Sequence, residues 1–157
     1  MKTLVLYESK FGNTKRVAET IGMQLLAEGP VRVTTIESYK PQFLGGVDLV
    51  LVGGATQGHG ATPEMRQFLA TLRFQAAGMR AIAFDTRLNG PIWLWGSAAR
   101  DIENELREAG FDVIGPAASF LVTLARHPEL HDGELQRAAA WARWSADEVR
   151  EEQLLAV

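Results

Sequence analysis

The sequence contains no cysteine among its 157 residues. That absence excludes disulfide bonds, thiolate catalysis, and metal or iron–sulfur sites that are held by cysteine. No apolar run approaches the roughly 20 residues that a membrane-spanning helix needs. Met1 and Lys2 lead directly into an apolar segment without the pattern of a signal peptide. We therefore expect a cytoplasmic protein.

An excess of positive charge is also lacking, because the formal net charge is −3 at pH 7. No basic stripe interleaved with aromatic residues occurs, so we expect no nucleic-acid partner. Apolar residues make up 46% of the chain and charged residues 22%, which is typical of a folded globular protein. The length predicts a single domain over residues 1–157 with a core of its own.

The usual arrangements of hydrolytic and metal chemistry are missing as well. We find no paired carboxylates, nucleophile elbow or activated serine, and we assign no catalytic residue. His59 has no acidic or histidine partner at the spacing of a metal site. His127 and His131 lie in one segment with two acids, but we predict no metal there.

Apolar segments of strand length alternate with segments of helical period along the chain. Such alternation predicts an α/β fold with a doubly wound parallel sheet and helices on both faces. The expected strands lie at 3–7, 31–36, 48–54, 79–85 and 111–122, the last interrupted by Gly115 and Pro116. The expected helices begin after Thr14, near Pro63, after Ser97 and near Gly133, and Ser97 should cap the helix that follows it.

The stretch from Ser9 to Thr14 joins the first expected strand to the first expected helix. Free N–H groups at a helix start, together with the helix dipole, form an anion site. The hydroxyls of Ser9 and Thr14 and the amide of Asn13 can bond phosphate oxygens. Gly12 lets the backbone come close. An ordinary turn capped by Asn13 or Thr14 is the alternative, but the first βα turn favours a phosphate site.

Two more loops should lie at the same edge of the sheet, because ligands bind beyond the carboxyl ends of parallel strands. Residues 53–62 contain four glycines, so backbone groups form much of the local surface. Residues 86–96 form a long loop with Trp93 and Trp95, either of which could stack on an aromatic ring. The alternative for residues 53–62 is a mobile surface loop, and the alternative for the two tryptophans is buried packing.

The stretch Ser9-Lys10-Phe11-Gly12-Asn13-Thr14 resembles the FMN-phosphate loop of the flavodoxin family, in its Ser-x-x-Gly-Asn-Thr form. Residues 55–58 and 84–96 match the other two flavin loops of that family in position. The sequence departs from flavodoxins at Phe11, where they usually carry threonine, and in its third loop. The resemblance covers nearly the whole chain.

This resemblance implies a five-stranded sheet in the order 2-1-3-4-5 and an FMN-binding redox protein. An electron carrier with a redox partner protein is favoured. An FMN-dependent NAD(P)H:quinone-type oxidoreductase and a module that has lost FMN are the alternatives. If Arg87 reaches the flavin ring, its charge should raise the flavin potential. The cofactor-binding residues implied are Ser9, Lys10, Phe11, Gly12, Asn13, Thr14, Thr56, Gln57, Gly58, His59, Gly60, Thr86, Arg87, Leu88, Trp95 and Gly96.

Overall fold

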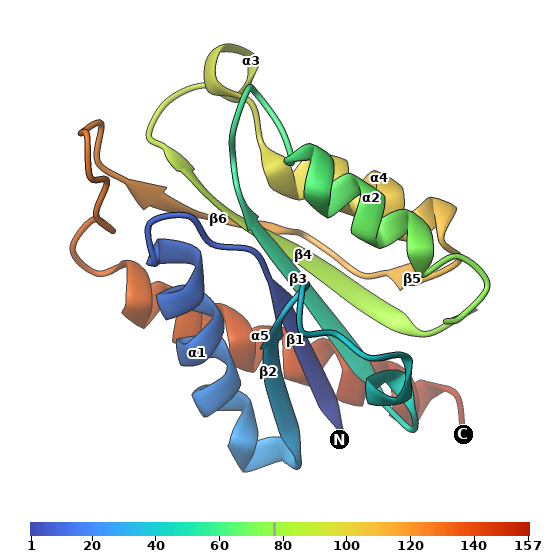
Figure 1. Cartoon of the computed structure of the whole chain (residues 1–157). Helices are drawn as coiled ribbons and strands as arrows, with labels where there is room; N and C mark the ends of the chain where they lie inside the picture. Colours follow the sequence, from blue (N-terminus) through green and yellow to red (C-terminus); the bar gives the residue numbers. More distant parts are fainter. Residues whose placement is uncertain (77) are drawn as a thin grey trace.

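The computed structural model describes residues 1–76 and 78–157 as a parallel sheet between two helical layers (Figure 1). The strands run in the order β2-β1-β3-β4-β5, and β6 also pairs with β4. The expected fold class and strand order are therefore confirmed. The strands are β1 Thr3–Tyr7, β2 Val31–Thr35, β3 Leu49–Ala55, β4 Arg80–Leu88, β5 Asp112–Val113 and β6 Ala118–Val122.

The helices cover both faces of the sheet, with α1 and α5 on one face and α2 and α4 on the other (Figure 1). Within the described residues, no helix is long and apolar enough to cross a membrane. The helices are α1 Asn13–Leu25, α2 Pro63–Thr71, α3 Ile92–Trp95, α4 Ala98–Glu108 and α5 Glu134–Leu155. Two short 3₁₀ helices, η1 Leu26–Glu28 and η2 Pro41–Leu44, complete the fold.

Side chains alternate between two apolar cores along each central strand, because successive residues of a strand point to opposite faces. Val5 packs toward α1 and α5, whereas Leu4 and Leu6 pack toward α2 and α4. Burial on both faces explains why β3 is a continuous apolar run. Trp141 of α5 packs against Phe84 of β4 with ring centroids 6.0 Å apart.

The expected fifth strand is two strands, which is the first correction to the sequence prediction. β5 pairs with the start of β4 and β6 with its end, on either side of the cis peptide bond between Gly115 and Pro116. The second pairing brings Phe120 opposite Thr86 and Val122 opposite Leu88. It also extends β4 through Leu88, so the expected long loop at 86–96 is wrong in its first three residues.

The rest of that expected loop is also more ordered than predicted, because it contains helix α3. The expected cap of the following helix differs too. The Ser97 side chain does not cap α4 but donates to Asp85 Oδ2 at 2.6 Å. The same carboxylate oxygen accepts the Ala99 N–H at 2.9 Å. A buried aspartate on the neighbouring strand therefore caps α4.

Candidate functional site

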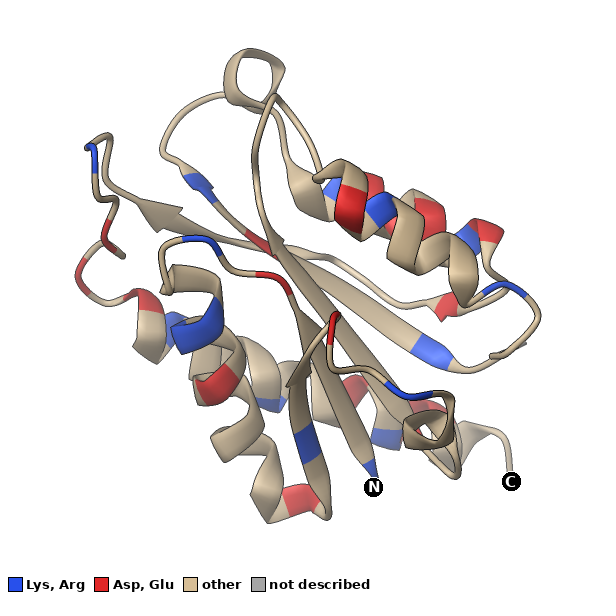
Figure 2. Ribbon diagram, in the orientation of Figure 1, with Lys and Arg blue, Asp and Glu red and all other residues tan. Residues whose placement is uncertain are grey.

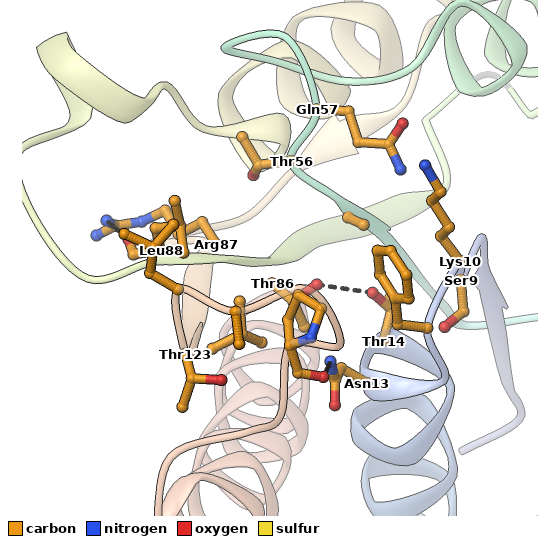
Figure 3. Close-up of a pocket in the computed structure, with 16 residues that line it drawn as sticks. Ser9, Lys10, Asn13, Thr14, Thr56, Gln57, Thr86, Arg87, Leu88 and Thr123 are labelled. Atoms are coloured by element: carbon orange, nitrogen blue, oxygen red, sulfur yellow. Dashed lines mark hydrogen bonds between the residues drawn. The ribbon is translucent and has the colours of Figure 1, made fainter.

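A cleft of about 250 Å³ opens where β1, β3, β4 and β6 reach their carboxyl ends (Figure 3). All three segments predicted from the sequence contribute to it, the third only through Thr86, Arg87 and Leu88, which belong to β4. Of the predicted residues, the cleft is lined by Ser9, Lys10, Phe11, Asn13, Thr14, Thr56, Gln57, Thr86, Arg87 and Leu88.

The first loop ends in Gly12, which is the N-cap of α1 with φ 88° and no side-chain cap. The alternative that Asn13 or Thr14 caps the helix is therefore wrong. Gly12 itself donates its N–H to Ser9 Oγ at 3.1 Å, which closes the loop. A Cβ added at Gly12 would meet nothing within 4 Å. The space beside Gly12 at the start of α1 is therefore open, as an anion site requires.

Two hydroxyls from distant elements meet at the floor of the cleft. Thr14 Oγ1 at the start of α1 and Thr86 Oγ1 near the end of β4 are 2.8 Å apart and hydrogen-bonded (Figure 3). Both threonines are almost fully buried. This bond fixes the first loop against β4, and it places two hydroxyl groups beside the uncapped helix start.

The second loop forms a tight turn instead of an open glycine surface. Gln57 and Gly60 exchange backbone hydrogen bonds of 2.9 and 3.1 Å. The two central residues, Gly58 and His59, both have positive φ, which is characteristic of a type I′ turn. The N–H and C=O groups of Gln57 and Gly60 therefore bond within the turn, and the surface offered to a ligand is smaller than the four glycines suggested.

The end of β4 combines a bracing arginine with a buried carboxylate. Arg87 donates through Nη1 to the carbonyls of Leu88 at 3.1 Å and Gly90 at 2.9 Å. It therefore holds the chain after β4 in place. Asp85 is fully buried and also accepts a long hydrogen bond of 3.4 Å from Thr56 Oγ1. Because Thr56 in turn accepts the Ala98 N–H at 3.0 Å, Asp85 connects the second loop to α4.

Six predicted residues lie outside the lining of the cleft: Gly12, Gly58, His59, Gly60, Trp95 and Gly96. Gly12 lines a smaller hollow beside it at the start of α1. His59 and Gly96 line another hollow between the second loop and α4. Trp95 packs against Gly90, where an added Cβ would lie 2.6 Å from the indole nitrogen. Neither Trp93 nor Trp95 reaches the cleft in this structure.

A fourth segment lines the cleft that the sequence reasoning missed, namely the connection from β6 to α5. It is held to the first loop, because Asn13 Nδ2 donates to the Pro128 carbonyl at 2.7 Å. Phe11 also meets His127 edge to face, with ring centroids 6.5 Å apart. No local pattern indicates this contact, apart from the polar residues that follow the last strand. The lining residues missed are Ala55, Val122, Thr123, Leu124, Ala125 and Pro128.

The charged side chains that line the cleft itself are cations. The ionisable residues that line it are Lys10 and Arg87, and neither forms an ion pair within the described residues. Glu8 lies just behind the first loop and accepts a hydrogen bond of 2.6 Å from Thr62. Burial raises the pKa of the Glu8 carboxyl, and the nearby charges of Glu64 and Glu37 add to the shift, against the Thr62 bond.

Comparison with known proteins decides the family. The sequence model described as flavodoxin matches residues 5–141. The chain belongs to the flavodoxin family. Flavodoxins bind FMN and transfer electrons through it, so this chain is an FMN-binding, flavodoxin-like redox protein. No protein among those of curated function matches the sequence.

Solved structures agree with this flavodoxin assignment. A flavodoxin from the domain Archaea is 25% identical, with a TM-score of 0.76 over 96% of this chain and 99% of that one. Flavodoxin 2 from Bacillus cereus is 19% identical, with a TM-score of 0.75 over 94% of this chain and 99% of that one. The Flv1 flavodiiron core from Synechocystis is 18% identical and has a TM-score of 0.74, over 97% of this chain and 36% of that one. The last two likenesses show the fold.

The residues of the cleft fit FMN. At one end, the uncapped start of α1 suits a phosphate group, and the hydroxyls of Ser9 and Thr14 lie beside it. At the other end, apolar side chains such as Leu88, Val122 and Leu124 suit an aromatic ring.

Proposed function

We propose that FMN binds in this cleft, with its phosphate at the start of α1, and that the chain carries electrons between partner proteins. The observation that supports this most is the uncapped helix start behind Gly12. The space beside Gly12 is open, and no carboxylate lines the cleft within the described residues. Backbone N–H groups that lack a partner at a helix start bind anions.

The first loop binds the phosphate with uncharged donors in this proposal. The amides of Asn13 and Thr14 point out of the first turn of α1, where no residue of the helix can accept them. The Thr14 hydroxyl can donate to a phosphate oxygen while it accepts from Thr86, because a hydroxyl both donates and accepts. Lys10 is exposed nearby and adds a positive charge at longer range.

The second loop, the end of β4 and the β6–α5 connection orient the ring. Thr56 and Gln57 lie on one side of the cleft, and Leu88 and Thr123 lie on the other (Figure 3). The flavin would supply the redox chemistry when bound. The protein supplies the orientation, the exclusion of water from the inner edge of the ring, and the local charge.

Spectroscopy of the purified protein tests this proposal. A yellow protein with flavin absorption bands, whose cofactor is released on denaturation and identified as FMN, is the expected result. A colourless protein that does not take up added FMN would overturn the proposal. Steady oxidation of NAD(P)H in the presence of a quinone would show that the chain is an enzyme. Slow NAD(P)H oxidation together with fast electron exchange with redox proteins is expected for a carrier.

A further inference from the structure

A β-hairpin follows the last strand and lines part of the cleft. Val122 at the end of β6 forms an antiparallel bridge with Leu130, and the Thr123 N–H donates to the Glu129 carbonyl at 2.8 Å. We call residues 122–130 the cleft hairpin. Both of its arms reach the cleft, because the lining includes residues 122–125 of the first arm and Pro128 of the second.

The base of the cleft hairpin is fixed by the first turn of α5. The Glu134 carboxylate accepts the Leu121 N–H at 2.6 Å, and Arg137 donates to the Ser119 carbonyl. The His131 N–H also donates to the Leu121 carbonyl at 2.9 Å. These bonds hold the side of β6 that does not pair with β4. The base therefore moves only if several hydrogen bonds break together.

The tip of the cleft hairpin is held by the start of α1. Asn13 Nδ2 donates to the Pro128 carbonyl at 2.7 Å, and Asn13 is only 8% exposed. Phe11 meets His127 edge to face beside this bond. The hairpin carries charged residues (Figure 2), but no ion pair between the described residues joins it to the first loop. The connection at the tip therefore depends on an uncharged hydrogen bond.

This arrangement gives the Asn13 side chain a role other than the one expected from the sequence. Its amide could bond phosphate oxygens, but in the structure it holds Pro128. The hairpin in turn presents groups to a ligand. Thr123 lines the cleft, and its hydroxyl accepts the Glu129 N–H at 3.0 Å (Figure 3). The same hydroxyl can also donate its hydrogen to a ligand, because a hydroxyl both accepts and donates.

We infer that the cleft hairpin retains the cofactor and that Asn13 is a positioning residue, which acts through the hairpin and not as a ligand of the phosphate. This inference rests on the proposed function, because the hairpin lines the proposed flavin site. The hairpin contacts the part of the cofactor that FMN and riboflavin share. Loss of the Asn13 bond should therefore weaken both flavins and leave the preference for the phosphate unchanged.

Titration of apoproteins with FMN and with riboflavin tests this role. Asn13→Ala should raise both dissociation constants severalfold and leave their ratio within roughly twofold of that of the unmodified chain. Asn104→Ala is the control, because Asn104 is exposed on α4, and it should change neither constant. If Asn13→Ala weakens FMN alone, its side chain binds the phosphate and the inference is wrong. Unchanged affinities for both flavins would also overturn it.

The kinetics of FMN binding distinguish retention from entry. A hairpin that retains the cofactor predicts that Asn13→Ala raises the dissociation rate by about the same factor as the dissociation constant. Stopped-flow fluorescence measures the association rate, and displacement by excess unmodified apoprotein measures the dissociation rate. A slower association with an unchanged dissociation rate would overturn retention.

Hydrogen exchange of the apoprotein tests the role of Asn13 without any flavin. Asn13→Ala should raise the exchange rate of the Thr123 amide severalfold, and leave that of the Leu121 amide at the base within roughly twofold. Unchanged exchange at Thr123 would overturn the inference even if FMN binds. If the unmodified chain binds no flavin, the proposed function fails and retention fails with it, whereas the exchange result still shows whether Asn13 holds the hairpin.

Discussion

Thr14 and Thr86 lie 72 positions apart in the chain and share a hydrogen bond of 2.8 Å between their Oγ1 atoms. One residue opens α1, and the other lies near the end of β4, so the bond joins the proposed phosphate site to the strand beneath the proposed ring site. Their roles are separable, because only Thr14 belongs to the first turn of α1.

Thr14→Val should weaken FMN binding about tenfold or more, because a hydrogen bond to a charged phosphate is lost. Thr86→Val removes the same bond between the threonines but leaves the Thr14 hydroxyl free to donate to phosphate. We expect similar losses of unfolding free energy for the two variants, and a much larger loss of FMN affinity for Thr14→Val. Equal FMN affinities of the two variants would place the phosphate elsewhere.

Asp85→Ala should lower the unfolding free energy of the apoprotein by roughly 2–4 kcal/mol, because it leaves buried donors of Ser97 and Ala99 without an acceptor. Asp101→Ala is a matched control, since Asp101 also accepts a backbone N–H, from Ala61 at 2.8 Å, but is partly exposed. Urea unfolding measures the unfolding free energy of both variants. A loss for Asp85→Ala no larger than for Asp101→Ala would contradict the role of Asp85 as the cap of α4.

Gly96→Ala tests the contact between the second and third loops. Gly96 has φ 75°, and an added Cβ would lie 1.9 Å from the backbone oxygen of His59. Gly133 has φ 85° and open space around an added Cβ, so Gly133→Ala measures the conformational cost alone. We expect about 1 kcal/mol of destabilisation at Gly133 and more than about 3 kcal/mol at Gly96. Thermal unfolding compares the two, and equal losses would mean that the loops separate easily.

The raised pKa of Glu8 predicts a pH-dependent stability. The folded chain holds this proton more tightly than the unfolded chain, so the contribution of Glu8 to stability falls as the pH rises above the usual carboxyl range. Glu8→Gln keeps an acceptor for Thr62 and removes the charge. We expect Glu8→Gln to raise the Tm of the apoprotein at pH 7 but not at pH 4.

Glu151→Gln serves as the control for Glu8→Gln, because Glu151 is exposed near the end of α5. It should show no such dependence on pH. If the Tm difference between Glu8→Gln and the unmodified chain is the same at pH 4 and pH 7, the environment assigned to Glu8 is wrong.

Arg87 tests whether charge at the end of β4 tunes the flavin. A guanidinium near the ring stabilises the negative charge that reduction adds, so Arg87→Ala should lower the midpoint potential. Arg87→Lys keeps the charge but loses the geometry that braces Leu88 and Gly90, so it should retain most of the potential and lose stability. Spectroelectrochemistry gives the potentials, and an unchanged potential in Arg87→Ala would reject the idea.

The fold was predictable because its signals are local. The apolar run of β3 and the four-residue recurrence of Val17, Ile21 and Leu25 each follow from burial of a strand or one face of a helix. The position at which α1 starts was predictable, but the identity of its N-cap residue was not. Gly12 is the N-cap residue because the backbone needs a positive φ at this position. The neighbouring residues in the sequence do not indicate that need.

The remaining parts of the site depend on contacts between distant segments. β4 extends to Leu88 only because β6 pairs with it, and the β6–α5 connection reaches the cleft through the bond from Asn13 to Pro128. The cap of α4 by Asp85 likewise joins two elements across the sheet edge. Such pairings follow from tertiary packing and override local propensity.

The most direct test of the phosphate site compares FMN with riboflavin, which has the same ring and no phosphate. Titration of the apoprotein, followed by flavin fluorescence, gives both dissociation constants. If the start of α1 holds the phosphate, FMN should bind at least about 100-fold more tightly than riboflavin, which corresponds to roughly 2.7 kcal/mol. Equal affinities for the two flavins, or no binding of FMN, would contradict the account.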